Sequence, residues 1–467
     1  MLHTNSVNSF EIKNEKRFNP TYFKFLNTRK ELINNKLLNF LPLGGNDKLT
    51  SLITDGEHAA ISIHEEGEKN ADIQYLNVHS VKFGIIDKTD SKYISKKDHD
   101  RLQRSKLVKN DVILTIVGSI GNSALVDDYL PETNIPRNIA KIVVNESKLK
   151  PEFLVCFFLS KFGKEQSYYS SGGNLQGLLS LTKIRGMYVP VPPFTIQNKY
   201  VKLYRSVLDK EKQSLILIES AKKYVYKKLG INFKKFSKRN YFSTTENNLK
   251  QSDFWTCMFR YPMYLKIENE LEKKFKMIEL EEKFFIDDGD EVGSENYFNI
   301  FDRGSDFIPF VRTSDFINYE TDQLNTQHAL PPELKISFKQ DLKEGDLLFS
   351  NDGKIGNVSI ITDSNVIIQS HINRLRSKNE NDFDTYYLFI LLLLKEIGQF
   401  QCKRLTWIQS TIPTIGNKMG KIRIPILEKS DRQHISTLVK KAFKLKKEKN
   451  QLLKKIKNTI DNELQYF

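Results

Sequence analysis

The sequence predicts an α+β fold in which two similar domains of mixed strands and helices are joined by two long helices packed as an antiparallel coiled coil. Three observations carry this prediction: a long internal repeat, strand-like runs ahead of an apolar helix in each copy, and a heptad-like stripe closing each copy. A chain of 467 residues has room for two or three domains. The predicted boundaries are 1–195 for the first domain, 196–230 for the first long helix, 231–254 for a linker, 255–430 for the second domain and 431–467 for the second long helix.

The internal repeat has an offset of 235 residues. Leu107–Leu114 matches Leu342–Phe349, so that Asp111 falls on Asp346. The same offset relates further apolar, glycine and polar positions: Ile120-Gly121-Asn122 and Ile355-Gly356-Asn357, Asn138 and Asn373, Phe153–Leu159 and Leu388–Leu394, Gly163 and Gly398, Lys183 and Lys418, Val189-Pro190-Val191 and Ile424-Pro425-Ile426. A constant register over this distance predicts two copies of one unit of about 230 residues.

Each copy contains the same order of predicted elements. Strands are expected at Leu107–Val117 and Leu342–Ser350, because an acidic or glycine turn precedes each apolar run. An Ile-Gly-Asn turn then leads into a second strand, Ser123–Val126 or Val358–Ile361. Apolar helices follow at 151–162 and 384–397, and each copy then reaches a short strand containing proline.

A long helix with an apolar stripe closes each copy. In the first helix apolar residues recur in steps of threes, fours and sevens up to Leu229, interrupted by Glu211 and Lys222, and Gly230 ends the helix. A similar stripe runs from Ile435 to Ile456 in the second copy. Two such stripes in one chain predict helices that pack on each other; the alternative is that each helix packs on its own domain.

Charge and apolar content narrow the class of protein. Lysine and arginine number 72 against 57 acidic residues, and the net charge of +15 indicates a polyanionic partner, either nucleic acid or an anionic membrane surface. The longest apolar run, Tyr386–Leu394, is far shorter than the ~20 residues that span a bilayer. The polar start Met1–Asn5 does not resemble a secretory signal, and the three cysteines lack disulfide or zinc spacing. We therefore expect a cytoplasmic protein without a membrane partner.

The sequence contains no recognisable catalytic constellation. It lacks a GxxxxGK[ST] loop, a GxGxxG loop after a strand and an HExxH motif. Asn19–Tyr22 faintly resembles the Asn-Pro-Pro-Tyr of adenine methyltransferases but lacks its second proline, which favours a structural use. The acidic run Asp287–Glu291 has no full counterpart in the first copy and is interpreted as a solvated turn. We accordingly predict no catalytic residue, no metal ligand and no cofactor in this chain.

Polar loop residues at matching places in the two copies are the candidate DNA contacts. Arginine pairs with guanine, and asparagine or glutamine with adenine, in the major groove, whereas phosphate contacts position a protein without specifying sequence. Solvent exposure is the alternative for any single residue, so the hypothesis rests on the whole set. In the first copy the candidates are His58, His79, Arg101, Arg104, Ser119, Arg137, Asn138, Gly172, Gly173, Asn174 and Gln176. In the second they are Arg312, Ser314, Asn351, Lys354, His371, Asn373, Arg374, Arg404, Trp407 and Gln409.

The two sets differ in kind although the surrounding scaffold matches. Ser170–Gln176 is a small-residue loop, whereas Lys403–Gln409 in the corresponding place is basic and aromatic. A shared scaffold with unequal loops is typical of two readers of two different sequences. Neutral drift of surface loops would produce the same pattern.

Taken in order, these motifs resemble the specificity (S) subunits of type I restriction-modification systems. No single motif is specific for this family. The order of the motifs, repeated in both copies at one offset, is specific for it. The features that carry the resemblance are Arg17–Tyr22, Ile53–His58, Leu107–Leu114 with Ile120-Gly121-Asn122, Gly172–Gln176, and Val189–Phe194 followed by Gln197 and a long helix. The second copy departs from this pattern where Ile424–Leu427 lacks the double proline.

The resemblance implies a non-catalytic DNA-binding subunit whose two target-recognition domains each read one half of a bipartite site. It implies that the long helices set the half-site separation and dock two methyltransferase subunits, and that ATP-dependent restriction subunits join the complex. A helix of 34 residues spans ~50 Å, enough for half-sites ~34–36 Å apart. The alternatives are a stand-alone DNA-modifying or cleaving enzyme with unrecognised catalytic residues, and a coiled-coil scaffold with no role in DNA binding.

Overall fold

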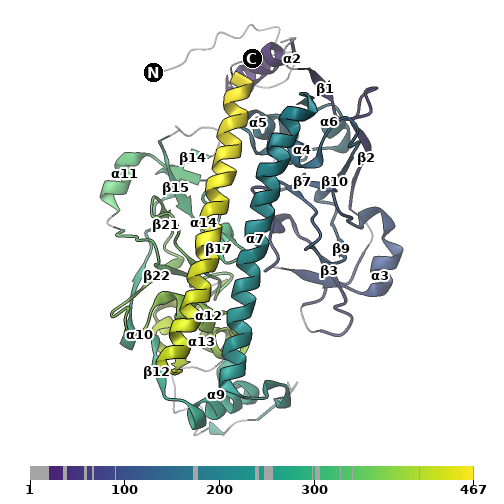
Figure 1. Cartoon of the computed structure of the whole chain (residues 1–467). Helices are drawn as coiled ribbons and strands as arrows, with labels where there is room; N and C mark the ends of the chain where they lie inside the picture. The colour runs from purple at the N-terminus through teal and green to yellow at the C-terminus, as the bar shows by residue number, and fades with distance from the viewer. Residues whose placement is uncertain are drawn as a thin grey trace. The chain divides into compact units, whose positions relative to one another are not determined.

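A computed structural model gives the fold of the chain, whose element order is drawn in Figure 1. It describes residues 20–34, 39–56, 60–65, 68–89, 91–171, 177–236, 241–243, 245–246, 256–296, 298–299, 306–324, 326, 328–338, 340–409 and 411–465. The chain divides into two compact units, which we call unit 1 (Met1–Asp209 and Lys449–Phe467) and unit 2 (Lys210–Glu448). Mixed strands and helices in both units confirm the predicted α+β class.

The centre of unit 1 is a four-stranded antiparallel sheet. Its strands, in spatial order, are β2 (Thr50–Asp55), β10 (Ile139–Val144), β7 (Val112–Thr115) and β8 (Ser123–Leu125). The smaller sheets of the described part of unit 1 pair β1 (Phe40–Pro42) with β11 (Tyr188–Pro190), β6 (Lys92–Ile94) with β3 (Ile73–Tyr75) and β9 (Thr133–Asn134), and β4 (Val81–Lys82) with β5 (Ile85–Ile86). Its shorter helices are α2 (Pro20–Asn34), α3 (Lys96–Arg101), α4 (Pro151–Leu159), α5 (Lys161–Ser170) and α6 (Leu181–Arg185).

Unit 2 contains a central sheet with the same strand order. Its strands are β13 (Phe284–Asp288), β22 (Ile372–Ser377), β19 (Leu347–Ser350) and β20 (Val358–Ile360). The other strands are β12 (Met277–Glu279), β14 (Phe298–Asn299), β15 (Ile308–Val311), β16 (Phe316–Ile317), β17 (Glu320–Thr321), β18 (His328–Leu330), β21 (Ile367–Ile368), β23 (Trp407–Gln409), β24 (Ile412–Thr414) and β25 (Arg423–Pro425). Its shorter helices are α9 (Pro262–Lys274), α10 (Leu280–Lys283), α11 (Pro332–Ser337), α12 (Thr385–Leu393) and α13 (Phe400–Leu405).

The registers of the two central sheets correct one of the repeat matches. Thr115 pairs with Ile139 in unit 1, and Ser350 pairs with Ile372 in unit 2. Thr115 and Ser350 differ by 235, but Ile139 and Ile372 differ by 233, because the stretch before β22 is two residues shorter than the stretch before β10. The predicted match of Asn138 with Asn373 is therefore wrong: Asn138 corresponds to His371, and Asn373 corresponds to Ala140.

The apolar helix predicted in each copy is divided at one equivalent point. In unit 1, α4 ends at Leu159 and α5 starts at Lys161 with Ser160 as its cap. In unit 2, α12 ends at Leu393 and a π-helical turn, Lys395–Gln399, leads into α13. After each break, a glycine of the next helical segment lies against the preceding helix. A Cβ on Gly163 would lie 2.2 Å from the carbonyl oxygen of Phe157, and a Cβ on Gly398 would lie 2.2 Å from that of Leu392.

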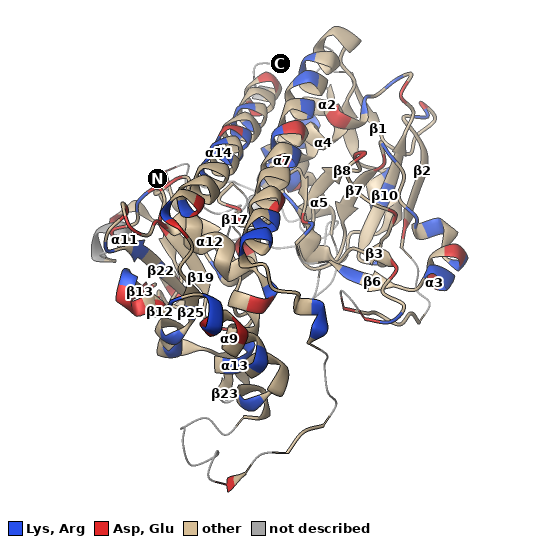
Figure 2. Cartoon of the chain, turned by 60° about the horizontal axis from the view of Figure 1, so that its bottom comes forward, with Lys and Arg blue, Asp and Glu red and all other residues tan. Residues whose placement is uncertain are grey.

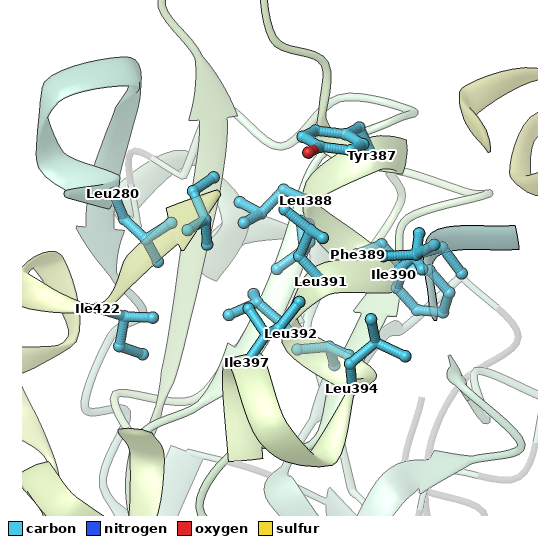
Figure 3. Close-up of a cluster of buried hydrophobic side chains, with 14 of the residues drawn as sticks. Leu280, Tyr387, Leu388, Phe389, Ile390, Leu391, Leu392, Leu394, Ile397 and Ile422 are labelled. Atoms are coloured by element: carbon cyan, nitrogen blue, oxygen red, sulfur yellow. The ribbon is translucent and has the colours of Figure 1, made fainter. Parts of the chain in front are cut away.

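The core of unit 2 is built around α12, whose side chains are apolar on nearly every face. Figure 3 shows Leu388, Leu391 and Leu392 of this helix among neighbours from other elements, including Leu280 and Ile422. All five side chains are buried. A helix that is apolar all round needs cover on all sides, and the sheet and the surrounding helices of unit 2 supply it.

The long helices are α7 (Phe194–Leu229) and α14 (Lys429–Gln465), each of which contributes residues to both units. Within unit 1, Lys199 of α7 contacts Glu463 of α14 at 3.0 Å. Within unit 2, Lys228 of α7 contacts Asp431 at 2.8 Å. In both units residues early in one helix therefore meet residues late in the other.

The two charges that interrupt the apolar stripe of α7 have different environments. Glu211 is buried and lies 3.2 Å from the Nζ of Lys446 on α14. Lys222 instead pairs with Glu219 of its own helix at 2.8 Å. Only the first interruption is therefore part of the contact between α7 and α14.

Candidate nucleic-acid interface

In unit 2, three segments meet at one end of the central sheet, which we call the loop end. They are the turn after β19, the residues before β22, and the hairpin of β23 and β24. The backbone N–H of Asn351 donates to the carbonyl of His371 at 3.0 Å, and that of Ile415 donates to the carbonyl of Asn351 at 2.9 Å. Gly353 donates to Pro413 at 3.0 Å. The fold thus brings together the predicted residues Asn351, Lys354, His371 and Trp407, although they are separated by up to 56 positions in the sequence.

The loop end of unit 1 has the same construction. Ile116 donates to the carbonyl of Asn138 at 2.9 Å, and Leu179 donates to the carbonyl of Ile116 at 2.9 Å. A Cβ on Gly118 would lie 4.0 Å from Val78, which places His79 and Ser119 on neighbouring segments. Arg137 is exposed beside Asn138. His79, Ser119, Arg137 and Asn138 therefore belong to one loop end.

Two arginines of unit 1 have contacts within the protein. Arg101 pairs with Asp98 of its own helix, α3, at 2.9 Å. Arg104 donates to the carbonyl of Gly56 at 2.8 Å and pairs with Asp55 at 3.1 Å; Asp55 is the last residue of strand β2 and Gly56 follows it. The side chains of Arg101 and Arg104 are nevertheless 48% and 46% exposed, so they remain able to contact a polyanion.

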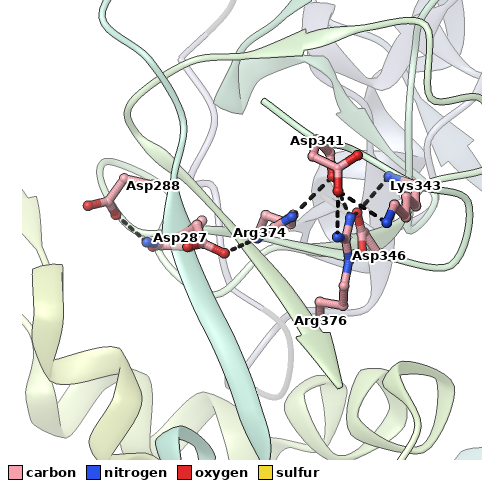
Figure 4. Close-up of polar contacts among 8 residues, drawn as sticks. Asp287, Asp288, Asp341, Lys343, Asp346, Arg374 and Arg376 are labelled. Carbon is pink, nitrogen blue, oxygen red and sulfur yellow. Dashed lines mark hydrogen bonds and ion pairs between the residues drawn. The ribbon is translucent and has the colours of Figure 1, made fainter. Parts of the chain in front are cut away.

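Arg374 and Asn373 belong to an ion-pair network on the central sheet of unit 2 (Figure 4). The guanidinium of Arg374 pairs with Asp287 and donates to the carbonyl of Asp341 at 3.0 Å, while the amide of Asn373 donates to Asp288. Because strand β22 pairs with β13 in register, the contacts with Asp287 and Asp288 join directly opposed residues. The network uses the Arg374 guanidinium to stabilise the sheet.

Arg376 is the centre of the same network. It donates to Asp346 at 2.8 and 2.7 Å and to Asp341 at 3.0 Å. The hydrogen bonds that Asp346 accepts raise the pKa of Arg376 above its ordinary value, and those that Arg376 donates lower the pKa of Asp341. Both charged forms are stabilised, so this part of the sheet stays ionised at neutral pH.

The remaining candidates of unit 2 divide between anchors and exposed groups. Arg404 donates to the carbonyl of Phe259 at 2.9 Å, pairs with Glu268 and lies 4.7 Å from the centre of the Phe259 ring. Trp407 packs against Gly416, where a Cβ would lie 3.0 Å from the indole. Lys354 and Ser314 are exposed, and the backbone of Arg312 caps a short 3-10 helix. Arg404 and Trp407 thus hold the base of the β23–β24 hairpin.

Some predicted residues lie outside the described residues. These are His58, Gly172, Gly173, Asn174 and Gln176. The backbone of Gln409 is part of β23, but its side chain is not described. Their roles in DNA binding stay predictions.

Sequence reasoning missed two exposed residues at the loop end of unit 2. Ile408 and Ile412 are exposed isoleucines flanking the turn of the β23–β24 hairpin. Their signal was the run Ile-Gln-Ser-Thr-Ile, in which polar residues between two apolar ones indicate a turn. Asn351 and Asn373, predicted as DNA contacts, are instead buried, at positions where unit 1 has Ile116 and Ala140.

The net positive charge does not single out the loop ends. Figure 2 shows lysine and arginine on α3, α7, α13 and α14, among other elements of both units. Within the described ranges no group of three or more His, Cys, Asp and Glu side chains could hold a metal ion. The helices in those ranges include none that is long and apolar enough to cross a membrane.

Comparison with known proteins gives the family. The family model "Type I restriction modification DNA specificity domain" matches residues 273–462. Residues 273–462 belong to this family, which confirms the one predicted from the sequence. The specificity subunit of the type I restriction enzyme EcoBI from Escherichia coli is 27% identical over 180 residues, which cover 38% of this chain and 37% of that protein. The match thus spans little more than a third of the curated relative's length.

Solved structures of specificity subunits align with nearly the whole chain. The S subunit of a type I restriction-modification system from M. genitalium covers 92% of this chain and 96% of its own, at 15% identity and a TM-score of 0.30. The HsdS subunit from Thermoanaerobacter tengcongensis covers 92% and 96%, at 14% identity and a TM-score of 0.29.

Proposed function

We propose that this chain is the sequence-specific DNA-recognition subunit of a type I restriction-modification enzyme, with each unit reading one half of a bipartite site. The observation that carries the proposal is the pair of central sheets, which share strand order and register but present different residues at their loop ends. Two equal scaffolds with unequal loops suit two different half-sites. The net charge of +15 supports a polyanionic partner.

We further propose that α7 and α14 pair as an antiparallel coiled coil that docks two methyltransferase subunits. The contacts of Lys199 with Glu463 and of Lys228 with Asp431 support this pairing within each unit. The 36 residues of α7 correspond to ~54 Å of helix, more than the ~34–36 Å between half-sites one DNA turn apart. In this proposal the helix lengths set the number of base pairs between the two half-sites.

The chemistry belongs to the partners in this proposal. Methyltransferase subunits supply adenosylmethionine and methylate the DNA, and restriction subunits cleave it with ATP. This chain supplies no catalytic residue and holds no cofactor. Its contribution is to choose the site, because base-edge contacts specify sequence while the partners act on whatever DNA is presented.

Mapping of methylated sites in the chain's own cells tests the proposal. We expect one motif, split into two halves, to lose methylation when the gene for this chain is deleted and to regain it when the gene is restored. Lys354→Ala combined with His371→Ala, at the loop end of unit 2, should relax or abolish one half only. Lys273→Ala, which removes an exposed lysine of α9 in the same unit, is the matched control and should leave both halves intact.

Two results would contradict the proposal. The first is an unchanged set of methylated sites after deletion. The second is methylation or cleavage of DNA by the purified chain alone with adenosylmethionine and magnesium, which would make it a stand-alone enzyme. Binding that is insensitive to both salt and DNA sequence would favour a scaffold instead, since phosphate contacts make specific binding depend on salt.

A further inference from the structure

The β23–β24 hairpin of unit 2 exposes isoleucines on both of its faces. Trp407 pairs with Thr414, Ile408 with Pro413 and Gln409 with Ile412. Directly paired residues share a face and successive residues alternate, so Ile408 and Ile412 lie on opposite faces of the ribbon. Ile408 is 73% exposed and Ile412 50% exposed. A partner that buries both side chains has to contact the ribbon from two sides.

The base of the hairpin is held firmly while its tip is exposed. Gly353 and Ile415 form backbone hydrogen bonds of 3.0 and 2.9 Å that tie the hairpin to the turn after β19. Thr406 donates to the carbonyl of Cys402 at 2.6 Å at the end of α13. Arg404 and Trp407 add the contacts with Phe259 and Gly416 described above. An exposed tip on a fixed base loses little conformational freedom on binding, which favours recognition.

The charge around the hairpin fits a polyanion. Residues 397–427 contain no aspartate or glutamate, and they include Lys403, Arg404, Lys418, Lys421 and Arg423. Of these, Arg404, Lys421 and Arg423 pair with glutamates of α9, β12 and α10. Lys403, four residues before Trp407 in the sequence, is exposed. The turn that pairs with the hairpin adds the exposed Lys354. Exposed isoleucines beside the exposed Lys403 and Lys354 are the composition expected of a surface that contacts bases between two rows of phosphates.

We infer that the β23–β24 hairpin inserts into the major groove of duplex DNA and that Ile408 and Ile412 contact the methyl groups of thymines in one half-site. This inference rests on the proposed function. Two strands lie ~4.8 Å apart and three residues extend ~10 Å, whereas the groove is ~12 Å wide and ~8.5 Å deep. A groove has two walls, so it covers both faces of the ribbon, whereas a flat protein surface would cover only one. The half-site read by unit 2 therefore contains thymine.

Replacing thymine by uracil, which lacks the methyl group, tests this inference. The mapped motif is made as duplex DNA with uracil in one half-site at a time, and its affinity is measured for the complex containing the full-length chain. We expect uracil in one half-site to weaken binding about fourfold for each methyl group removed from the interface. The Ile408→Ser, Ile412→Ser double variant should bind the thymine and uracil duplexes equally. Val108→Ser, at a residue of unit 1 that is 61% exposed, is the control and should keep the wild-type difference.

The outcomes separate this inference from the proposed function. If the wild-type complex binds the mapped motif but is indifferent to uracil in both halves, the inference fails and the proposed function stands. A double variant that still discriminates against uracil, or a half-site motif without thymine, also overturns the inference. Loss of methyltransferase assembly in the double variant with unchanged uracil sensitivity would identify the hairpin as a protein-binding surface. Failure of the wild-type complex to bind the mapped motif overturns both.

Discussion

The central sheets of units 1 and 2 are alike at one end and different at the other. At the start of β7, Asp111 accepts a hydrogen bond from the backbone of Val108 at 2.8 Å. At the start of β19, Asp346 accepts the same bond from Lys343 at 2.7 Å. At the loop end, Ile116 and Ala140 of unit 1 are replaced by Asn351 and Asn373 in unit 2. The two units therefore share the aspartate turn before the central strand. They differ in the residues that lie beneath the loops at the other end of the sheet.

This difference places unpaired polar atoms beneath the loops of unit 2. Asn351 and Asn373 are nearly as buried as their apolar counterparts, and the Oδ1 atom of each lacks a hydrogen-bond partner among the described residues. A buried, unpaired polar atom costs about 1–3 kcal/mol. Residues retained at such a cost are expected to serve the loop above them. We therefore interpret the loop end of unit 2 as shaped by recognition more than by folding.

The helix contacts give the largest expected difference between the units. In unit 2, Lys446 is fully buried between Glu211 at 3.2 Å and Glu320 at 3.7 Å. In unit 1, the lysine of the Lys199–Glu463 pair is 53% exposed. Lys446→Ala removes a fully buried cation from between two buried carboxylates and should lower the free energy of unfolding by about 3–5 kcal/mol. Lys199→Ala should change it by less than about 1 kcal/mol.

Urea unfolding of the two lysine variants measures this contrast. Equal, small losses for both variants would mean that the buried group in unit 2 is hydrated or rearranged. Equal, large losses would mean that the exposed pair in unit 1 holds the helices as strongly as the buried one. Either result would remove this difference between the units.

One glycine in each unit occupies an equivalent position, and substitution of either glycine should destabilise the protein to a similar extent. Gly56 follows β2 and Gly289 follows β13, and a Cβ would lie 2.1 Å from the carbonyl oxygen of Ile135 and 2.3 Å from that of Gln369. Neither oxygen can move without shifting the backbone. Gly56→Ala and Gly289→Ala should each lower the free energy of unfolding by about 1–3 kcal/mol or more.

Gly186→Ala is the control for the glycine variants, since its Cβ would meet nothing closer than 3.6 Å. Urea unfolding of each single variant provides the comparison. A large loss of unfolding free energy for one glycine variant and none for the other would contradict this expectation. It would show that the two glycines, although matched in sequence and position, contribute unequally to stability. The scaffold would then be shared in outline only.

The buried asparagines give a smaller effect of opposite sign. The Asn351→Ile, Asn373→Ala double variant copies unit 1 into unit 2. It should raise the free energy of unfolding by up to about 1 kcal/mol, because the removal of two unpaired amide oxygens outweighs the loss of the hydrogen bonds that the amide nitrogens donate to Ser370 and Asp288. It should also weaken binding to the half-site read by unit 2. Urea unfolding and binding to the mapped duplex measure the two effects.

Asn122→Ala is the matched control in unit 1. The Oδ1 of this buried asparagine accepts a hydrogen bond from Lys164 at 2.7 Å, so its removal strands a buried cation and should destabilise the protein. If the unit 2 double variant is destabilised as well, its amides have partners that contribute to folding, and the interpretation of the loop end as shaped by recognition fails.

The sequence predicted the shared scaffold better than the site, for a physical reason. Apolar and glycine positions such as Gly163 and Gly398 are fixed by packing, so they keep a constant offset and are visible without a structure. The match of Asn138 with Asn373 failed because the polar loop before the strand is two residues shorter in unit 2. The flanking strands keep the same pairing in both units despite this change in loop length. Ile408 is 73% exposed, so core packing does not impose a repeating apolar pattern around it, and the sequence offers only the short run Ile-Gln-Ser-Thr-Ile as a signal.

Arg374 illustrates a second limit of sequence reasoning. As an arginine in a polar run it suits guanine recognition, but the structure pairs it with Asp287, which lies 87 residues away. Long-range ion pairs of this kind depend on sheet register and cannot be inferred from a single sequence. The acidic run Asp287–Glu291, interpreted as a solvated turn, contributes partly to this network.

The smallest expected effect concerns the acid titration of one carboxylate in each unit. Burial raises the pKa of Asp111 in unit 1, whereas hydrogen bonds from Arg376 lower the pKa of Asp341 in unit 2. Asp111 takes up its proton more readily in the folded protein, so its contribution to stability rises as the pH falls from its raised pKa towards the ordinary value of about 3.9. The contribution of Asp341 is present above about 3.9 and is lost as the pH falls through its lowered pKa. Unfolding free energies of the wild type, Asp111→Asn and Asp341→Asn between pH 7 and pH 3 should therefore diverge with opposite slopes, and slopes of the same sign would show that the two carboxylates share one environment after all.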